Sequence, residues 1–355
     1  MMTNHLSNRC FRGREVMSQP EVSIITLTYN HAKYIAECLD SVYRQSFQSW
    51  EQIIIDDGST DGTWDIIQQY VQKDSRFRAY QQEHVGPFRM VETYNRALFH
   101  ATGKLIAILE GDDSWPPHKL KTQTVLHEPG IIFSYGRTLI IDENNSIIRP
   151  YSNFEWDDKP LPAQKLRMEL LCRQAGIMPV SVMLDRDTLL SIGGFRSERI
   201  AMPDGSFCIF PSADYATFIR YLFNDGYVRR SNDVLGHWRQ HTTQTTHVYE
   251  NIFHEGAFQL ALQGLYASRE RNKYKHLYRS HRKFASGFYL NVLRRALMDG
   301  DKIRAKMAIR RLLWWGGSKR RLEAIYGFLA LLVGMNMETP FALYEKILAV
   351  NKGED

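Results

Sequence analysis

The chain has 355 residues, of which 44% are hydrophobic and 24% are charged, the balance of a globular protein that buries a core without disulfides or metals. This composition excludes disordered, collagen-like and coiled-coil proteins. The formal net charge is +6, and no helix-turn-helix, zinc-finger or RNP pattern accompanies it, so we expect no nucleic-acid partner.

The first half of the chain alternates strand and helix signals. Runs rich in β-branched residues alternate with segments whose apolar residues have helical spacing. Strands are expected at residues 22–28, 51–55, 77–80 and 104–109, and helices at 30–43, 63–73 (with Asp61 as its cap) and 90–101. Near-continuous apolar strands between helices predict an α/β fold with a mostly parallel Rossmann-type sheet, flanked by helices on both faces.

The middle of the chain is mixed, and the C-terminal part is helical. Strands are expected at residues 130–135, 137–141 and 181–184, and helices at 187–192 and 215–224. From about residue 251 the pattern is helical throughout. Within this part we expect the following side chains to point inward: Tyr289, Val292, Leu293, Ala296, Ile303, Met307 and Leu313.

These patterns divide the chain into three regions. Residues 1–17 are expected to be a flexible lead-in, because basic residues without an apolar segment are not typical of a signal peptide. Residues 18–250 form the mixed region and residues 251–355 a helical, basic C-terminal region. The four cysteines contain no CxxC pair, which favours a reducing compartment, and no run reaches the ~18–20 apolar residues of a membrane span. We expect a cytoplasmic protein, with contact to the cytoplasmic membrane face left open.

Polar clusters follow three of the predicted strands directly. They are Thr28-Tyr29-Asn30, Asp56-Asp57-Gly58-Ser59 and Glu110-Gly111-Asp112-Asp113. Ligands of an open parallel sheet bind at the carboxyl ends of its strands. We therefore expect the three clusters to meet in one cleft, and this convergence is a stronger signal than any single cluster.

Two of these clusters have residue types that suit a nucleotide and a metal ion. The pair Asp112-Asp113 is either a turn or helix cap, or a Mg²⁺ or Mn²⁺ site that leaves positions for substrate phosphates. Asp57 is either part of a turn, or the acceptor of a base N–H beside a stacking Tyr29. Other nucleotide motifs are poorly supported, because no GxGxxG follows a strand and no GxxxxGK[ST] is present.

The residues resemble the family 2 glycosyltransferases, which are inverting enzymes with the GT-A fold. The resemblance runs from about Val22 to Thr246 through several motifs in the family's order: VSIITLTYN, SVYRQSFQSWEQIIIDDGSTDGT, NRALFHATGKLIAILEGDDSWPPHKL, LLSIGGF, SADYATFIRYL and WRQHTTQTT. Two positions depart from the family pattern. Glu110 stands where an Asp is common, and Arg196 follows Gly193-Gly194-Phe195 where an acid is common.

The resemblance implies a role for each matching residue. The donor-binding residues would be Thr28, Tyr29, Asn30, Asp57, Asp112, Trp238 and Arg239, and the metal would be held by Asp112, Asp113 and His241. Asp214 matches the catalytic base, although it also suits a helix N-cap. The base would take the acceptor hydroxyl's proton, and the cofactor, Mn²⁺ or Mg²⁺, would neutralise the departing nucleoside diphosphate.

The charge is concentrated in the C-terminal region. Residues 269–321 hold 17 Lys and Arg against three acids, a net charge of +14, which leaves −8 for the rest. This segment is either a set of solvated helix faces or a surface for acidic lipids or an anionic acceptor. The apolar residues 324–335 favour a buried helix by their length, with membrane contact as the alternative. A homo-oligomer stays open.

The sequence therefore predicts a metal-dependent inverting glycosyltransferase. It would move a sugar from a nucleoside-diphosphate sugar, UDP-sugar by default, to a saccharide or lipid-linked acceptor in surface polysaccharide synthesis. One alternative is a nucleotidyltransferase, which would need a basic Gly-rich loop where Thr28-Tyr29-Asn30 stands. The other is an inert nucleotide-sugar-binding scaffold of the same fold.

Overall fold

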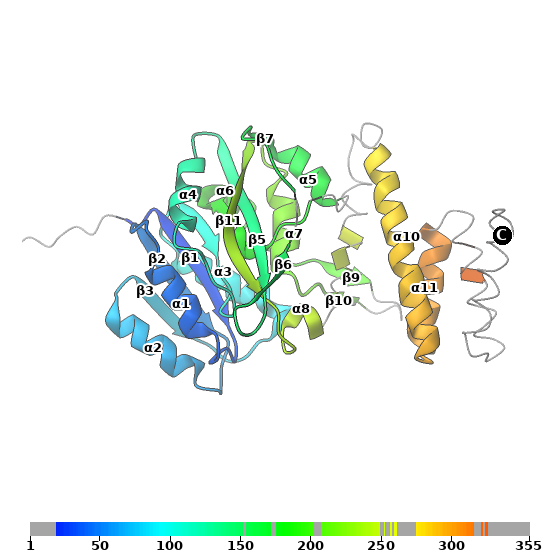
Figure 1. The fold of residues 1–355 in the computed structure, drawn as a ribbon, viewed down its shortest axis with the longest axis horizontal. Coiled ribbons are helices and arrows are strands. Elements are labelled where there is room, and N and C mark those ends of the chain that lie inside the picture. Colours follow the sequence, from blue (N-terminus) through cyan, green and yellow to red (C-terminus); the bar gives the residue numbers. More distant parts are fainter. Residues whose placement is uncertain are drawn as a thin grey trace, which may run out of the picture.

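A computed structural model gives the fold (Figure 1). It describes residues 19–151, 154–171, 175–201, 207–248 and 275–315, and the single positions 252, 256, 257, 259, 260, 321, 324 and 325. The whole lead-in at 1–17 and residues 326–335 of the expected apolar helix lie outside the described residues.

The described residues form one central sheet of nine strands. Its order is β3-β2-β1-β4-β8-β5-β11-β7, with β6 paired to β5. The strands are β1 (Val22–Thr28), β2 (Trp50–Asp56), β3 (Phe77–Gln81), β4 (Leu105–Ile108), β5 (Ile131–Ile141), β6 (Ile147–Pro150), β7 (Leu161–Pro162), β8 (Met183–Asp185) and β11 (Tyr227–Arg239). Strands β1 to β4 run parallel to one another, and β11 runs parallel to β5. Strands β6, β7 and β8 pair antiparallel. The mostly parallel sheet predicted from the sequence is therefore confirmed.

Helices cover both faces of this sheet. They are α1 (Ile35–Tyr43), α2 (Thr63–Lys73), α3 (Met90–His100), α4 (Lys119–Leu126), α5 (Ala163–Leu171), α6 (Arg186–Ser191) and α7 (Ala213–Tyr221), with 3₁₀ turns η1 (Pro87–Arg89) and η2 (Pro179–Ser181). The short helix α8 (Thr245–Val248) and the ribbon of β9 (Arg199–Ala201) and β10 (Phe207–Ile209) lie beside the sheet. The first two helices end at the residues expected from the sequence, although α1 begins at Ile35 rather than at residue 30.

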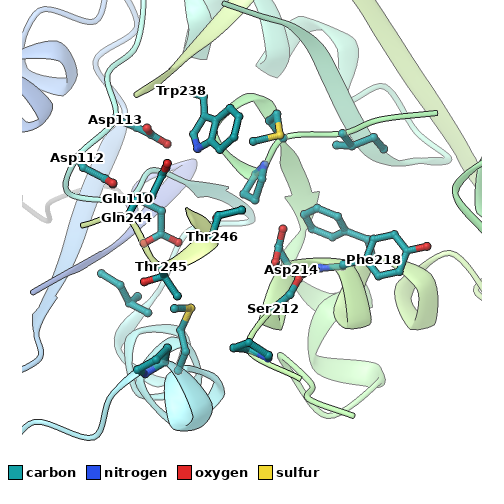
Figure 2. Close-up of a pocket in the computed structure, with 18 of the residues that line it drawn as sticks. Glu110, Asp112, Asp113, Ser212, Asp214, Phe218, Trp238, Gln244, Thr245 and Thr246 are labelled. Carbon is teal, nitrogen blue, oxygen red and sulfur yellow. Dashed lines mark hydrogen bonds between the residues drawn. The ribbon is translucent and has the colours of Figure 1, made fainter. Parts of the chain in front are cut away.

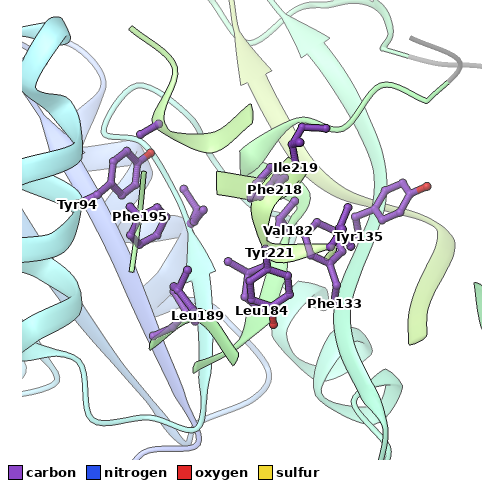
Figure 3. Packing of buried hydrophobic residues seen from close by; sticks show 14 of the residues in the cluster. Tyr94, Phe133, Tyr135, Val182, Leu184, Leu189, Phe195, Phe218, Ile219 and Tyr221 are labelled. Carbon is purple, nitrogen blue, oxygen red and sulfur yellow. The ribbon is translucent and has the colours of Figure 1, made fainter. Parts of the chain in front are cut away.

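Alternate residues of the central strands pack into two separate apolar layers, one on each face of the sheet. Ile25 and Leu27 of β1 pack with α3, α5, α6 and α7, and Figure 3 shows the aromatic part of this layer around Phe133, Phe218 and Tyr221. Val22 and Ile24 pack with α1, α2 and α4 on the other face. Because both faces are covered, the strands are apolar almost throughout, as in parallel sheets generally.

The C-terminal described helices pack on each other. Helices α10 (Lys275–Met298) and α11 (Lys302–Trp315) lie side by side at one end of the molecule (Figure 1). The expected inward face of α10 is confirmed, since Tyr289, Val292, Leu293 and Ala296 are buried.

The expected inward face of α11 is wrong at two positions. Ile303 is 76% exposed and Leu313 is 41% exposed, while Met307 is half-buried. The helix instead buries Ala305, Ala308, Ile309 and Leu312 against α10. Two of these residues are alanines, whose small side chains let the two helices approach closely. No helix within the described part of the chain has both the length and the apolar character needed to span a bilayer.

Candidate active site

A cavity of about 1630 Å³ opens at the carboxyl ends of β1, β2 and β4. Eight of the ten site residues expected from the sequence line it, namely Thr28, Tyr29, Asn30, Asp57, Asp112, Asp113, Asp214 and Trp238. The predicted convergence of the three polar clusters is therefore confirmed. The other two expected residues, Arg239 and His241, do not line the cavity.

The turn after β1 is fixed by hydrogen bonds to the turn after β2. Asn30 adopts a left-handed backbone conformation with φ of 53°, which asparagine tolerates better than most residues. Its side-chain oxygen accepts from the Thr60 N–H at 2.9 Å, and its own N–H donates to Ser59 Oγ at 2.8 Å. The turn thereby presents Tyr29, which is 40% exposed, to the cavity.

Asp57 is already surrounded by donors. A carboxylate offers about four lone-pair positions, and four nitrogens lie within 2.6–3.1 Å of its oxygens: Gln82 Nε2, His84 Nδ1, Val85 N and Gly86 N. The His84 ring also stacks on Tyr29, with ring centroids 3.9 Å apart. A base N–H can reach Asp57 only if one of these donors moves away, and His84 is the exposed one.

Gly111 allows the ends of β1 and β4 to approach each other. A Cβ atom at this position would lie 2.6 Å from Thr28 Oγ1 and 2.9 Å from His31 Nδ1. Real Cβ contacts are not this short, so any larger residue would push these two side chains away. The glycine in Glu110-Gly111-Asp112-Asp113 is thus part of the construction of the site.

Three carboxyl groups gather at the end of β4: Asp112 and Asp113 are buried, and Glu110 is half-buried. Burial and the neighbouring Asp112 charge raise the pKa of Asp113 well above its usual range. Burial, together with Asp112 and Asp214, does the same to the pKa of Glu110, which also accepts a hydrogen bond from the Tyr94 hydroxyl. Carboxyl groups this close cannot all be ionised without a cation.

Asp112 is the ionised member of this group. Burial alone would raise its pKa, but His31 and His241 more than offset burial and lower it. His241 Nε2 lies 3.0 Å from Asp112 Oδ2. One ligand atom from each of His31, Asp112 and His241 falls within 4.8 Å of the others, a spacing that fits a metal ion. Burial lowers the pKa of His31, and the nearby Asp112 charge opposes this effect.

Arg239 is a correction to the expected donor-binding set. Its side chain is 1% exposed and does not line the cavity. Every guanidinium nitrogen is used inside the protein, by the Asp112 carbonyl at 2.8 Å, the Asp142 carbonyl at 3.0 Å, Asn145 Oδ1 at 2.6 Å and Glu37 at 2.9 Å. Its backbone N–H donates to Asp113 Oδ1 at 2.9 Å. Arg239 therefore holds the acidic pair in place from behind.

Asp214 stands on the opposite wall of the cavity from the acidic cluster (Figure 2). It lies in the first turn of α7, whose N-cap is Ser212. The Ser212 hydroxyl donates to Asp214 Oδ1 at 2.5 Å. Burial raises the pKa of Asp214, and the Ser212 hydrogen bond opposes this rise. Ser212 therefore both caps α7 and donates a hydrogen bond to the carboxyl group that faces the cavity.

Several cavity residues were not foreseen from the sequence. His31, His84, Tyr94, Ser212 and Gln244 all line the cavity. His31 directly follows Asn30, and Ser212 lies two residues before Asp214, so closeness to predicted site residues was the available signal. The cavity is also lined by the aromatic residues Tyr151, Phe154, Trp156, Phe210 and Trp238, which are widely separated in the sequence.

Comparison with known proteins identifies the family. The model of "Glycosyl transferase family 2" matches residues 23–189. The "Putative teichuronic acid biosynthesis glycosyltransferase TuaG" of Bacillus subtilis is 32% identical over 225 residues, which cover 62% of this chain and 79% of TuaG. The chain belongs to glycosyltransferase family 2. The "UDP-Glc:alpha-D-GlcNAc-diphosphoundecaprenol beta-1,3-glucosyltransferase WfgD" of Escherichia coli is 32% identical over 47% of this chain and 61% of its own length, so the match spans less than two thirds of WfgD.

Solved structures show the same fold. S. aureus TarS 1-349 in complex with UDP-GlcNAc has a TM-score of 0.59 and 16% identity, over 92% of each chain. The mannosyltransferase PcManGT from Pyrobaculum calidifontis, in complex with GDP-Man and Mn²⁺, has a TM-score of 0.50 and 17% identity, over 94% of this chain and 85% of that one. At these identities the likeness establishes a shared GT-A-like fold for this family 2 glycosyltransferase.

Proposed function

We propose that this family 2 glycosyltransferase moves a sugar from a nucleoside-diphosphate sugar, UDP-sugar first among them, to a hydroxyl of a saccharide or lipid-linked saccharide, with inversion. The observation that supports this most directly is the opposition of Asp214 and the acidic cluster across one cavity. A reacting sugar between these walls has a base on one side and a cation-binding group on the other.

Asp214 is the proposed catalytic base. The acceptor oxygen forms a bond to the anomeric carbon as the bond from that carbon to the diphosphate oxygen breaks. The acceptor proton goes to Asp214, and the electron pair of the broken bond leaves with the nucleoside diphosphate. One displacement inverts the anomeric centre and needs no enzyme nucleophile, unlike a retaining glycosidase.

The residues at the end of β4 fit a divalent cation. Asp112, Asp113 and His241 would hold it. Burial and the Asp112 charge raise the pKa of Asp113, and a bound cation would favour its ionised form. Bound Mn²⁺ or Mg²⁺ would neutralise charge on the departing diphosphate. Arg239 positions Asp112 and Asp113 through its backbone and side-chain hydrogen bonds.

Tyr29 and Asp57 are the proposed site for the nucleobase. The base would stack on Tyr29 in place of the His84 ring, and its N–H would replace His84 beside Asp57. Thr28 and Asn30 shape the same turn, and Trp238 would lie against the donor or acceptor. The aromatic wall around Tyr151 and Trp156 suits the apolar faces of an acceptor saccharide.

Surface polysaccharide synthesis is the proposed setting. The names of TuaG and of WfgD refer to teichuronic acid and to a diphosphoundecaprenol acceptor, and both are consistent with a lipid-linked acceptor. Residues 18–250 would form the transferase domain. The basic region within 251–355 would contact the cytoplasmic face of the membrane or a second copy of the chain.

Asp214→Asn tests this proposal. It should lower kcat by about 10²–10⁴-fold, because the acceptor proton loses its base, while the dissociation constant of the nucleotide sugar stays within twofold. Asp225→Asn, on an acid beyond the end of α7, is the matched control. Full sugar transfer by Asp214→Asn would contradict the assignment. An inert scaffold would bind the donor without turnover in the unaltered protein, and a nucleotidyltransferase would release pyrophosphate from a nucleoside triphosphate.

A further inference from the structure

The cluster of His31, Asp112 and His241 holds more metal-binding groups than the acidic pair alone. His241 Nε2 and Asp112 Oδ2 are 3.0 Å apart, the separation of two ligands about 2.1 Å from one ion at a right angle. All three candidate ligand atoms lie within 4.8 Å of one another. Ligands on opposite sides of an ion are about 4.2 Å apart, so a small contraction would close the cluster on a cation.

Among the described residues, the His31 ring makes no hydrogen bond that would prevent it from binding a metal ion. Its Nδ1 atom is buried and makes no hydrogen bond within the described part of the chain, and a buried nitrogen without a partner is costly. Its backbone N–H is fixed by Thr63 Oγ1 at 2.9 Å, and its ring lies edge-on to His241 with centroids 6.2 Å apart. The ring is therefore held beside Asp112 by groups other than its own nitrogens.

Asp113 is less available than His31 as a ligand. One of its carboxylate oxygens already accepts the Arg239 N–H at 2.9 Å. Two imidazole groups, those of His31 and His241, have a ligand atom within 4.8 Å of an Asp112 carboxylate oxygen. The donor set around Asp112 thus contains nitrogen as well as oxygen.

We infer that His31 is a direct ligand of the divalent cation, together with Asp112 and His241. The ion then has two imidazoles from the protein beside the carboxylates already proposed for it, and its remaining positions are open to the diphosphate. Imidazole favours first-row transition ions, whereas Mg²⁺ prefers oxygen ligands. The site should therefore bind Co²⁺ and Mn²⁺ more tightly than Mg²⁺. The inference rests on the proposed function only for the claim that this ion serves sugar transfer.

Cobalt binding to the full-length chain tests the inference directly. Co²⁺ alone, and Co²⁺ with UDP, would be titrated while the visible absorption of the ion and the heat of binding are recorded. His31→Ala and the more conservative His31→Asn should each weaken Co²⁺ binding by at least about tenfold, since even outer-shell partners cost 10–100-fold. His118→Ala, on an exposed histidine at the start of α4, should bind Co²⁺ as the unaltered protein does.

The two His31 variants also separate loss of a ligand from loss of the fold. Their melting temperatures would be measured beside Co²⁺ binding, and a folded His31→Asn with weak binding supports the inference. Unaltered Co²⁺ affinity and absorption in either folded variant would overturn it, as would absence of Co²⁺ binding by the unaltered protein. Tight, His31-dependent Co²⁺ binding without transfer from any nucleotide sugar would leave the inference standing and contradict the proposed function.

Discussion

The site depends on single residues whose environment changes their chemistry. The residue type of Asp214 does not by itself indicate a shifted pKa. In the structure, burial raises the pKa of its carboxyl group, and the hydrogen bond from the Ser212 hydroxyl opposes that rise. A base is active when ionised, so its activity is present at high pH and is lost as pH falls through the raised pKa. A substitution of Ser212 should therefore change the acid side of the pH dependence of kcat.

Ser212→Ala should move that acid limb to higher pH. The variant loses the hydrogen bond that favours ionised Asp214, so the carboxyl takes up a proton at a higher pH. Loss of the N-cap should also cost about 1 kcal/mol of stability. The measurement is the pH dependence of kcat, with Ser212→Thr as the control that keeps a hydroxyl. An unchanged acid limb in Ser212→Ala would show that Asp214 does not set the profile.

At the scale of elements, a buried carboxylate joins three strands to the loop before a fourth. Glu51 of β2 accepts from Ser23 Oγ at 2.7 Å, from the Thr102 N–H at 2.7 Å and from Arg78 at 2.8 Å. Burial alone would raise the pKa of Glu51, but these hydrogen bonds lower it overall. They lie at the edge of the sheet where the parallel strands begin, opposite the cavity.

Glu51→Ala should destabilise the fold by about 2–4 kcal/mol, because buried donors lose a charged acceptor. Since the folded pKa is depressed, the contribution of Glu51 is fully present above its unfolded pKa, about 4.3, and is lost as pH falls through the folded pKa. The measurement is urea unfolding at pH 7 and at successively lower pH, beside Glu128→Ala on an exposed glutamate. Equal stability of the two variants would contradict this role.

Elements with a clear apolar period were predictable, and those built on buried polar groups were not. Strand β1 and helix α2 have the expected bounds, and β2 extends one residue beyond the expected bounds at each end, because apolar period and turn chemistry agree there. Helix α4 was missed because two of its buried positions are polar: Lys119 donates to the Val182 carbonyl, and Gln123 to Ser134 and Ser181.

Strand β11 was missed for a related reason. Its first half is a polar run whose pairing with β5 contains register shifts, so no period of two is visible. Arg239 at its end was placed near the site but given the wrong partners. Sequence spacing cannot show that its guanidinium reaches back to Glu37 of α1.

At the scale of the whole molecule, the exposed side of α10 and α11 combines apolar and basic groups. Met298 is 72% exposed and Ile303 is 76% exposed, and Arg295, Lys306 and Arg310 are exposed on the same two helices. Apolar side chains rimmed by bases are typical of surfaces that lie on anionic membranes. This arrangement supports the proposed peripheral contact and gives it a specific surface.

Replacing Arg295, Lys306 and Arg310 with Gln should weaken binding to anionic vesicles by about 100-fold. Each base near such a surface contributes about 1 kcal/mol, and a tenfold change corresponds to about 1.4 kcal/mol. Co-sedimentation with phosphatidylglycerol vesicles is the measurement. The control replaces the exposed bases Arg44, Lys104 and Lys121, which lie outside the helices α10 and α11. Equal vesicle binding by the two triple variants would remove the membrane proposal and leave the transferase proposal intact.

The most direct test of the central claim is a donor panel with purified protein. UDP-, dTDP- and GDP-sugars would be incubated with Mn²⁺ or Mg²⁺, and sugar release measured with and without EDTA. We expect slow hydrolysis of a UDP-sugar that requires the metal and is lost in Asp214→Asn, because water can replace the acceptor in the cavity. Failure to bind or hydrolyse any nucleotide sugar, with or without metal, would contradict the proposed function.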